Sequence, residues 1–319
     1  MSTLTPRIDK IDKNYLINGA FDFFQRNTGS VTIGGGFSYQ TADRWAIGYN
    51  AGGGITSQTS ARSATVPNGS VKYSIKLSAN APTSAGNMLI RQRIEAANAR
   101  ELSGQIVNLS VWVRSESASQ VRLDVSTPTV EDNFTSTTLV SNTFKTVTVG
   151  TSWQLVTFED ITIPAAANMG LQITLSVENF TITGLIKDHY MSQVMLNVGD
   201  KVADFARAGV SIAGELQLCQ RYYEYNPNQI AIYLAGSGTG YTGISYPYKV
   251  TKRATPTLVV TDTPGNVNKI TVITNNTGGQ NPNQNVLVHV NGIDTHRLLF
   301  VDNSTSFGIL YNFTADAEL

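Results

Sequence analysis

The chain has 319 residues, which is enough for one large or two medium domains with hydrophobic cores. Charged residues make up 14% of it, and 23 basic residues balance 23 acidic ones, so the formal net charge is zero. This balance argues against nucleic-acid binding, which requires an excess of Lys and Arg to neutralise phosphates. The single cysteine, Cys219, excludes an internal disulfide and a cysteine-based metal cluster.

Apolar and polar residues alternate along much of the region up to residue 200, a pattern typical of half-buried strands. The alternation is clearest at 72–77, 107–114, 121–125 and 171–178, and clusters of Gly, Pro and Asn separate these runs. Many short strands at modest spacing predict an all-β fold, either a sandwich or a jelly roll. No apolar run approaches the ~20 residues of a membrane span, and the N-terminus has no apolar signal core.

The pattern changes once, near residue 211. Ser211 is suited to cap a helix, because its hydroxyl accepts a hydrogen bond from a free backbone N–H of the first turn. Glu215 then places a negative charge in that turn, where it complements the helix dipole. We expect a short linking helix that ends at Asn226 and Pro227. Four residues are spaced to share its apolar face: Leu216, Cys219, Tyr222 and Tyr223.

Strand patterns resume after this helix and predict a second, smaller β-sandwich. Gly-rich segments at 236–240 and 275–283 are expected to be loops between its strands. The largest basic cluster, Lys249, Lys252 and Arg253, is expected to lie in a solvated loop. The strand runs are 230–234, 244–248, 258–260, 270–273, 286–290, 298–301 and 307–313.

Two separated blocks carry a family resemblance. The first runs from Asn14 to Arg26 and is followed by Thr-Ala-Asp-Arg-Trp at 41–45, and the second runs from Gly214 to Tyr225. Together they resemble bacteriophage tail-fibre and appendage virion proteins built on a carbohydrate-binding-module-like jelly roll. The resemblance implies structural roles for the signature residues Asn18, Gly19, Phe21, Gln25, Arg26, Asp43, Arg44, Trp45, Cys219, Gln220, Arg221, Tyr222 and Tyr223.

The resemblance and the strand patterns together predict four parts of the chain. Residues 1–13 form an N-terminal attachment arm, since this polar segment cannot build a core of its own. Residues 14–208 form the jelly-roll β-sandwich, 209–226 the short connecting helix, and 227–319 the distal β-sandwich. We expect the arm to bind other virion proteins, and the resemblance implies a homotrimer.

The sequence contains no pattern of a catalytic site, and we expect no enzymatic activity. His189, His289 and His296 lie near no G-x-S-x-G sequence, and no H-E-x-x-H spacing indicates a metal. Cys219 lies on the apolar helix face, where a free cysteine packs as a small hydrophobe. Glycan hydrolysis would require two carboxylates about 5–10 Å apart across a cleft. The sequence does not reveal such a pair among Asp124, Glu131, Asp132, Glu159, Asp160 and Glu178.

Trp112 is the leading candidate for ligand binding. It falls on the polar side of its strand, opposite Val111 and Val113, so it faces away from the core. One interpretation is that it stacks on a sugar ring, with Arg122 and Asp124 on the same sheet face. The other is that a loop or a neighbouring subunit covers it.

Two further groups are candidates for binding. Tyr241, Tyr246 and Tyr248 cluster near a Gly-rich loop, where they favour either ligand binding or packing between subunits. The resemblance also implies a structural calcium ion, with Asp22 and Asp43 as oxygen ligands. The alternative for Asp43 is an internal ion pair with the adjacent arginine.

The resemblance implies a virion protein on the phage exterior, which we expect to be made in the host cytoplasm and released by lysis. Its expected function is adhesion to host-surface glycans by non-catalytic binding, as a tail fibre or similar appendage. The alternatives are a capsid-attached head fibre or decoration protein with a structural role, a glycan depolymerase, and a secreted bacterial carbohydrate-binding module. No cofactor other than the calcium ion, no membrane insertion and no nucleic-acid partner are expected.

Overall fold

The computed structural model describes residues 12–34, 36–50, 57–80, 86–118, 120–180, 186–234, 240–274, 280–302 and 307–319. The chain divides into two compact units, one comprising the residues up to Leu216 together with Leu319, the other Gln217–Glu318. The predicted attachment arm lies outside the described residues except for Asp12 and Lys13. Lys13 forms an exposed ion pair with Glu101 at 2.7 Å.

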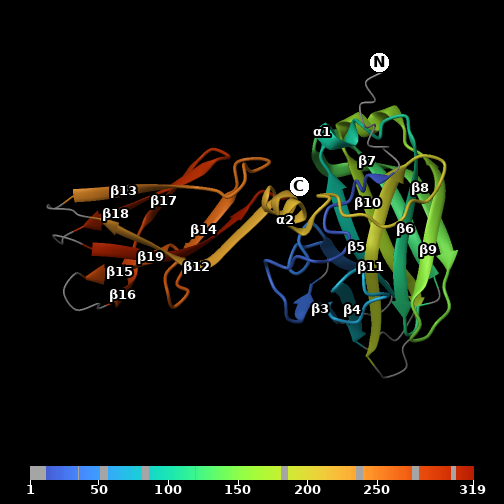
Figure 1. Ribbon diagram of the computed structural model, residues 1–319, viewed down its shortest axis with the longest axis horizontal. Coiled ribbons are helices and arrows are strands. Elements are labelled where there is room, and N and C mark those ends of the chain that lie inside the picture. The colour runs from blue at the N-terminus through green and yellow to red at the C-terminus, as the bar shows by residue number, and fades with distance from the viewer. Residues whose placement is uncertain are drawn as a thin grey trace, which may run out of the picture. The chain divides into compact units, whose positions relative to one another are not determined.

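Two antiparallel sheets build the first unit (Figure 1). The six-stranded sheet has the order β1 (Val31–Ile33), β3 (Ser57–Ser63), β4 (Ser74–Asn80), β11 (Lys187–Val198), β6 (Ile106–Ser115) and β9 (Gln154–Thr162). The five-stranded sheet has the order β2 (Ala46–Asn50), β5 (Gly86–Ile94), β10 (Leu171–Phe180), β7 (Gln120–Val130) and β8 (Asn133–Thr146). The predicted all-β sandwich fold is confirmed.

The core of the first unit lies between these two sheets. Strand β6 contributes Val107, Leu109, Val111 and Val113 to it, and the facing strand β10 contributes its own alternate residues, beginning at Leu171. Because successive side chains on a strand point to opposite faces, the residues between these apolar positions face outward. Each sheet therefore presents a second, more polar face on the outside of the sandwich.

The helices among the described residues include α1 (Ala96–Ala99), the 3₁₀ helix η3 (Ala165–Met169) and α2 (Ile212–Gln220). The predicted cap of α2 is confirmed, because the Ser211 hydroxyl accepts a hydrogen bond from the Gly214 N–H at 3.1 Å. The predicted end at Asn226 and Pro227 is wrong. The helix stops at Gln220, and Tyr223 begins a strand that pairs with the C-terminal strand of the chain. Backbone pairing there overrides the helical spacing of the apolar residues.

Two sheets also build the second unit (Figure 1). The larger contains β12 (Tyr223–Leu234), β19 (Phe307–Asp316), β15 (Lys269–Thr274) and β16 (Gln280–Asn285) in that order, with β14 (Thr257–Thr261) also paired to β19. The smaller has the order β13 (Gly240–Pro247), β18 (Thr295–Asp302) and β17 (Leu287–Asn291). Part of the loop expected at 275–283 is strand β16, which lacks an apolar alternation but pairs its backbone with β15.

A buried ion pair in the second unit overturns one prediction. Lys252, expected in a solvated loop, is fully buried, and its ammonium group lies 2.6 Å from the Glu224 carboxylate. It also donates to the Gln220 carbonyl at 2.6 Å and lies 5.0 Å from the centre of the Tyr248 ring. Burial lowers the pKa of Lys252, although Glu224 opposes this shift. The prediction of a solvated loop was wrong for Lys252, because a lysine can be buried where an ion pair and hydrogen bonds satisfy its ammonium group.

No helix among the described residues is both long and apolar enough to cross a bilayer.

Candidate functional site

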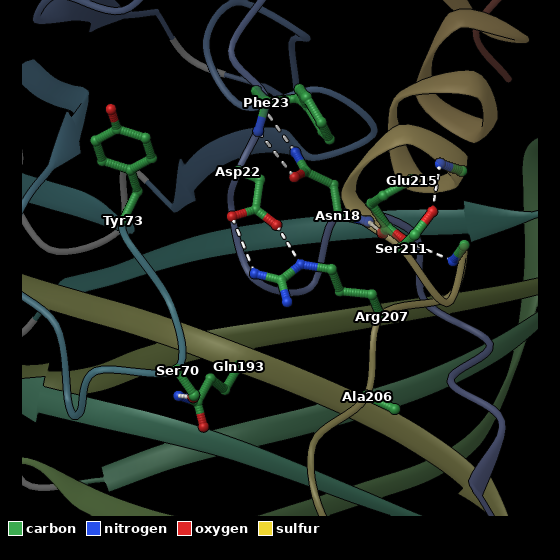
Figure 2. Close-up of polar contacts among 12 residues, drawn as sticks. Asn18, Asp22, Phe23, Ser70, Tyr73, Gln193, Ala206, Arg207, Ser211 and Glu215 are labelled. Carbon is green, nitrogen blue, oxygen red and sulfur yellow. Dashed lines mark hydrogen bonds and ion pairs between the residues drawn. The ribbon is translucent and has the colours of Figure 1, made fainter.

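The first signature block is held together by polar contacts around Asn18 (Figure 2). The Asn18 side chain accepts a hydrogen bond from the Phe23 N–H at 3.1 Å and donates to the Phe23 and Asp43 carbonyls, each at 2.9 Å. Its backbone carbonyl accepts the Trp45 indole N–H at 3.1 Å. Asn18 has a positive φ of 58°, a conformation that asparagine tolerates better than most residues. These bonds join the segment 14–26 to the segment 41–45.

Packing around Asn18 explains most of the other signature residues. The rings of Phe21 and Trp45 are fully buried, with their centroids 5.5 Å apart. A Cβ at Gly19 would lie 2.1 Å from the Val194 carbonyl oxygen, so no larger residue fits there. In the second block, Cys219, Gln220, Tyr222 and Tyr223 are buried and Arg221 is half-buried.

The two carboxylates proposed for calcium both have protein partners. Asp22 pairs with the Arg207 guanidinium at 2.7 Å, as Figure 2 shows. Asp43 is buried and accepts hydrogen bonds from the Gln25 backbone and side chain at 3.0 and 2.8 Å, while Arg26 lies 4.0 Å away. No group of three or more potential ligands of the His, Cys, Asp or Glu type gathers within the described part of the chain. The calcium ion stays a prediction that these contacts do not support.

The alternative to calcium binding was an ion pair between Asp43 and the adjacent Arg44. Arg44 is also buried. Its guanidinium donates to the Arg93 carbonyl at 2.5 Å, and its φ is 70°.

The outward face of the six-stranded sheet carries the pocket that contains Trp112. Trp112 on β6 is half-buried and lies beside Leu155 of β9 and Ser192 of β11 in the strand register. It lines a pocket of about 450 Å³ that we call the Trp112 pocket. The pocket is lined by Asn68, Ser110, Trp112, Leu155, Thr157, Glu159, Gln193, Val202, Ala203, Asp204 and Phe205.

The floor of the Trp112 pocket follows from the pleat of two neighbouring strands. Ser110 and Trp112 of β6 alternate with buried valines, and Thr157 of β9 pairs directly with Ser110. Thr157 also donates a hydrogen bond to the Glu159 carboxylate at 2.9 Å. An aromatic ring, hydroxyls and a carboxylate therefore share one hollow, which is the mixture of surfaces that sugar recognition requires.

Gln193 shapes the wall on the β11 side. It has a φ of 51° and lies where the register between β11 and β6 shifts, between Ser192 and Met195. Such a bulge re-aims side chains beside functional sites. The Gln193 side-chain amide donates to the Asn68 side chain at 2.8 Å and to the Ser70 hydroxyl at 2.9 Å, and Figure 2 shows Ser70 beside Gln193. The loop before β4 is thereby fixed along this wall.

A charged and aromatic network borders the Trp112 pocket on the same face. Tyr190 of β11 lies between Lys76 of β4 and Arg114 of β6, with the guanidinium 4.9 Å from the centre of its ring. The Trp153 ring centroid lies 6.2 Å from that of Tyr190. Asp188 receives the Lys76 ammonium at 2.7 Å and the Tyr190 hydroxyl at 3.2 Å.

The pKa values in this network follow from these contacts. Burial alone would raise the pKa of Asp188, but hydrogen bonds from Lys76 and Ser78 outweigh it and hold that pKa below its usual value. Burial, with the neighbouring Asp188 charge, raises the pKa of Tyr190 to about 12. At neutral pH Asp188 is therefore ionised and Tyr190 keeps its proton.

Arg122 and Asp124 do not share a face with Trp112, which corrects one expectation. They lie on β7 in the five-stranded sheet, whereas Trp112 lies on β6 in the six-stranded sheet. The outward faces of the two sheets point in opposite directions, because each turns its apolar residues to the common core. Arg122 is also engaged there, with Asp124 at 3.1 Å and Glu178 at 3.0 Å.

The predicted tyrosine cluster belongs largely to the core of the second unit. Tyr248 is buried, and Tyr246 packs against the same core cluster. Both rings lie within about 6 Å of the rings of His296 and Phe313. The interpretation of these two residues as loop-tip binding residues is wrong. The backbone of Tyr241 lies on β13, but its side chain is outside the described residues.

Two of the three histidines are buried within strands. His189 lies 3.0 Å from the Ser115 hydroxyl, and burial lowers its pKa to about 4 despite the nearby Asp188 charge. His296 lies 3.5 Å from the Tyr311 hydroxyl, and burial lowers its pKa to about 4 as well. His289 is exposed on β17.

Sequence reasoning missed most of the lining of the Trp112 pocket. Asn68, Gln193, Asp204 and Phe205 come from three separate segments, and none carries a distinctive local pattern. The one available signal was the break in alternation along β11 near Gln193, where the bulge lies.

Comparisons with known proteins give no assignment. No family model matches the chain, and no curated protein matches it either. Among solved structures, one similar protein is a putative sugar-binding protein from Bacteroides thetaiotaomicron, with 15% identity and a TM-score of 0.39 over 59% of this chain and 100% of that one. Another is the module TmCBM61 in complex with beta-1,4-galactotriose, with 14% identity and a TM-score of 0.36 over 59% and 99%.

A phage structure is also similar. The enzymatically active domain of bacteriophage CBA120 tailspike protein 4 has 14% identity and a TM-score of 0.38, over 58% of this chain and 21% of that one. Many of the similar structures are thus carbohydrate-binding modules, and one is a tailspike domain. With identities and TM-scores this low, the ligands and activities in those descriptions are those proteins' own.

Proposed function

We propose that this protein binds glycans without cleaving them, and that the Trp112 pocket is the binding site. The observation that carries the proposal is the half-buried indole of Trp112, which lines a pocket of about 450 Å³ together with hydroxyl, amide and carboxylate groups. Part of the indole is therefore accessible to a ligand. The C–H face of a sugar ring can stack on the indole while the sugar hydroxyls bond to neighbouring polar groups.

The polar groups around the indole fit this role. Ser110 and Thr157 place hydroxyls on the floor, and Asn68 places an amide on one wall, where Gln193 donates a hydrogen bond to it. Gln193 is almost completely buried and is bonded to the Asn68 loop, so the wall is held in place before a ligand arrives. Such preorganisation reduces the entropy cost of binding.

We further propose that the chain is an external virion protein of a bacteriophage, such as a tail fibre. The support is the resemblance of two blocks, 14–26 and 214–225, whose residues form the scaffold around Asn18 and the buried residues near Cys219. In this proposal the protein is a homotrimer attached through residues 1–13. Several weak sites on one particle then bind cooperatively, because the second contact is effectively intramolecular.

An array of bacterial surface oligosaccharides tests the glycan-binding proposal. We expect the wild-type protein to bind a subset of the array and Trp112→Ala to lose that binding. The matched control is Phe144→Ala, which removes an exposed aromatic ring from the opposite sheet and should leave binding unchanged. Light scattering on each variant checks that the oligomeric state is preserved. Binding that survives Trp112→Ala would place the site elsewhere, and an empty array would favour a purely structural role.

A further inference from the structure

The ionisable side chains that line the Trp112 pocket are all acidic. The only ionisable groups that line it are the carboxylates of Glu159 and Asp204, and both residues are exposed to solvent. Among the described residues, neither carboxylate has a cationic partner: Glu159 accepts a hydrogen bond from the neutral Thr157 hydroxyl, and Asp204 makes no ion pair. Elsewhere on this face Lys76 pairs with Asp188, and Arg114 pairs with Glu116.

The two carboxylates come from opposite sides of the pocket. Glu159 lies on the edge strand β9, on one side of β6 in the sheet order. Asp204 lies in the segment after β11, on the other side of β6. That segment is tied to the end of β11, because the Asn197 side chain donates to the Lys201 carbonyl at 2.9 Å and accepts from the Ala203 N–H at 3.2 Å. The pocket is therefore bordered by one carboxylate on the β9 side and by another on the segment after β11.

We propose that the Trp112 pocket selects glycans that carry a protonated amino group, such as oligomers of glucosamine, and rejects glycans that carry carboxylates or phosphates. This inference rests on the proposed glycan-binding function and adds a charge preference to it. At about 5 Å in a water-like dielectric, one charge pair changes an affinity by about 4-fold. Two carboxylates that attract the same amine therefore give a preference on the order of 10-fold over the uncharged sugar. The preference should weaken as salt screens the charges.

The experiment compares three oligosaccharides with one backbone. They are a glucosamine oligomer with free amines, the same oligomer N-acetylated, and the same oligomer carrying carboxymethyl groups on its acetylated form. Calorimetry at a mildly acidic pH, where the amine is protonated, should rank the affinities in that order. Glu159→Gln and Asp204→Asn should each weaken binding of the free-amine oligomer about 4-fold relative to binding of the acetylated oligomer. The control Glu131→Gln removes the same charge from a distant turn and should change neither.

The outcomes separate the inference from the function on which it rests. If the acetylated oligomer binds as tightly as the free-amine oligomer and Trp112→Ala abolishes both, the pocket binds glycans but the charge preference is wrong. If the double variant Glu159→Gln with Asp204→Asn keeps the full preference for the amine, the carboxylates are not its origin. If no oligomer binds, both the preference and the glycan-binding proposal fail for this class of sugar.

Discussion

His189 should make the stability of the first unit depend on pH. It lies on β11, the strand that carries Tyr190 and Gln193 on the face with the Trp112 pocket, and it is completely buried. Burial lowers its pKa from 6.5 to about 4, although the Asp188 charge opposes the shift. The neutral imidazole is therefore the form that the folded sheet accommodates.

The sign and size of the effect follow from this pKa. Between pH 6.5 and about 4 the unfolded chain binds a proton at His189 and the folded chain does not. The free energy of unfolding thus falls as the pH falls through this window and is unaffected by this residue above it. A shift of about 2.5 pKa units corresponds to about 3 kcal/mol, which is a large share of the stability of a typical domain.

Urea unfolding followed by tryptophan fluorescence measures this effect for the first unit alone. All three tryptophans, Trp45, Trp112 and Trp153, lie in that unit, whereas the other buried histidine, His296, lies in the second. The variant His189→Gln keeps a polar side chain but cannot titrate. We expect its loss of stability between neutral pH and pH near 4 to be smaller than that of the wild type by about 3 kcal/mol. An identical pH slope in the two proteins would refute the reasoning, whatever their stabilities at neutral pH.

Three further predictions concern other parts of the chain. Lys252→Met should destabilise the second unit by about 3–5 kcal/mol, because it leaves the Glu224 carboxylate buried without its cation, and adding Glu224→Leu should recover much of that loss in thermal unfolding. Gly19→Ala should destabilise the first unit by about 3 kcal/mol or prevent its folding, since the new methyl group would clash with the Val194 carbonyl. The control in the same urea titration is Gly29→Ala, at an exposed position. Incubation with the oligosaccharides that the protein binds should release no reducing ends, and release that Glu159→Gln abolishes would instead indicate a hydrolase.

Alternation was enough to predict the strands but not their partners. The run at 107–114 predicted both strand β6 and the outward direction of Trp112, because the period of a strand fixes which face each residue occupies. The next strand in sequence, β7, crosses to the other sheet, so Arg122 faces the opposite way. Alternation repeats identically in either sheet, and therefore cannot show which sheet a strand joins.

Long-range contacts account for what the sequence did not predict. Lys252 was predicted to be solvated because its neighbours in sequence do not indicate its partner. That partner, Glu224, lies 28 positions earlier and forms a buried ion pair with it. Of the Trp112 pocket, the sequence predicted only the exposed indole. The other lining residues come from segments far apart in the sequence, including strand β9, the Asn68 loop and residues 202–205. The signature blocks were more informative, because Asn18 bonds to Phe23, Asp43 and Trp45, which all belong to the first block.

The most direct test of the central claim is whether a bound glycan contacts Trp112. The protein has three tryptophans, so its indole N–H signals are few enough to assign by NMR with single Trp→Phe variants. On titration with the tightest-binding oligosaccharide from the array, we predict that the Trp112 signal shifts to saturation. The Trp45 signal should stay in place, because that indole is buried and bonded to Asn18. Saturable binding that leaves the Trp112 signal unmoved would contradict the assignment of this pocket as the glycan site.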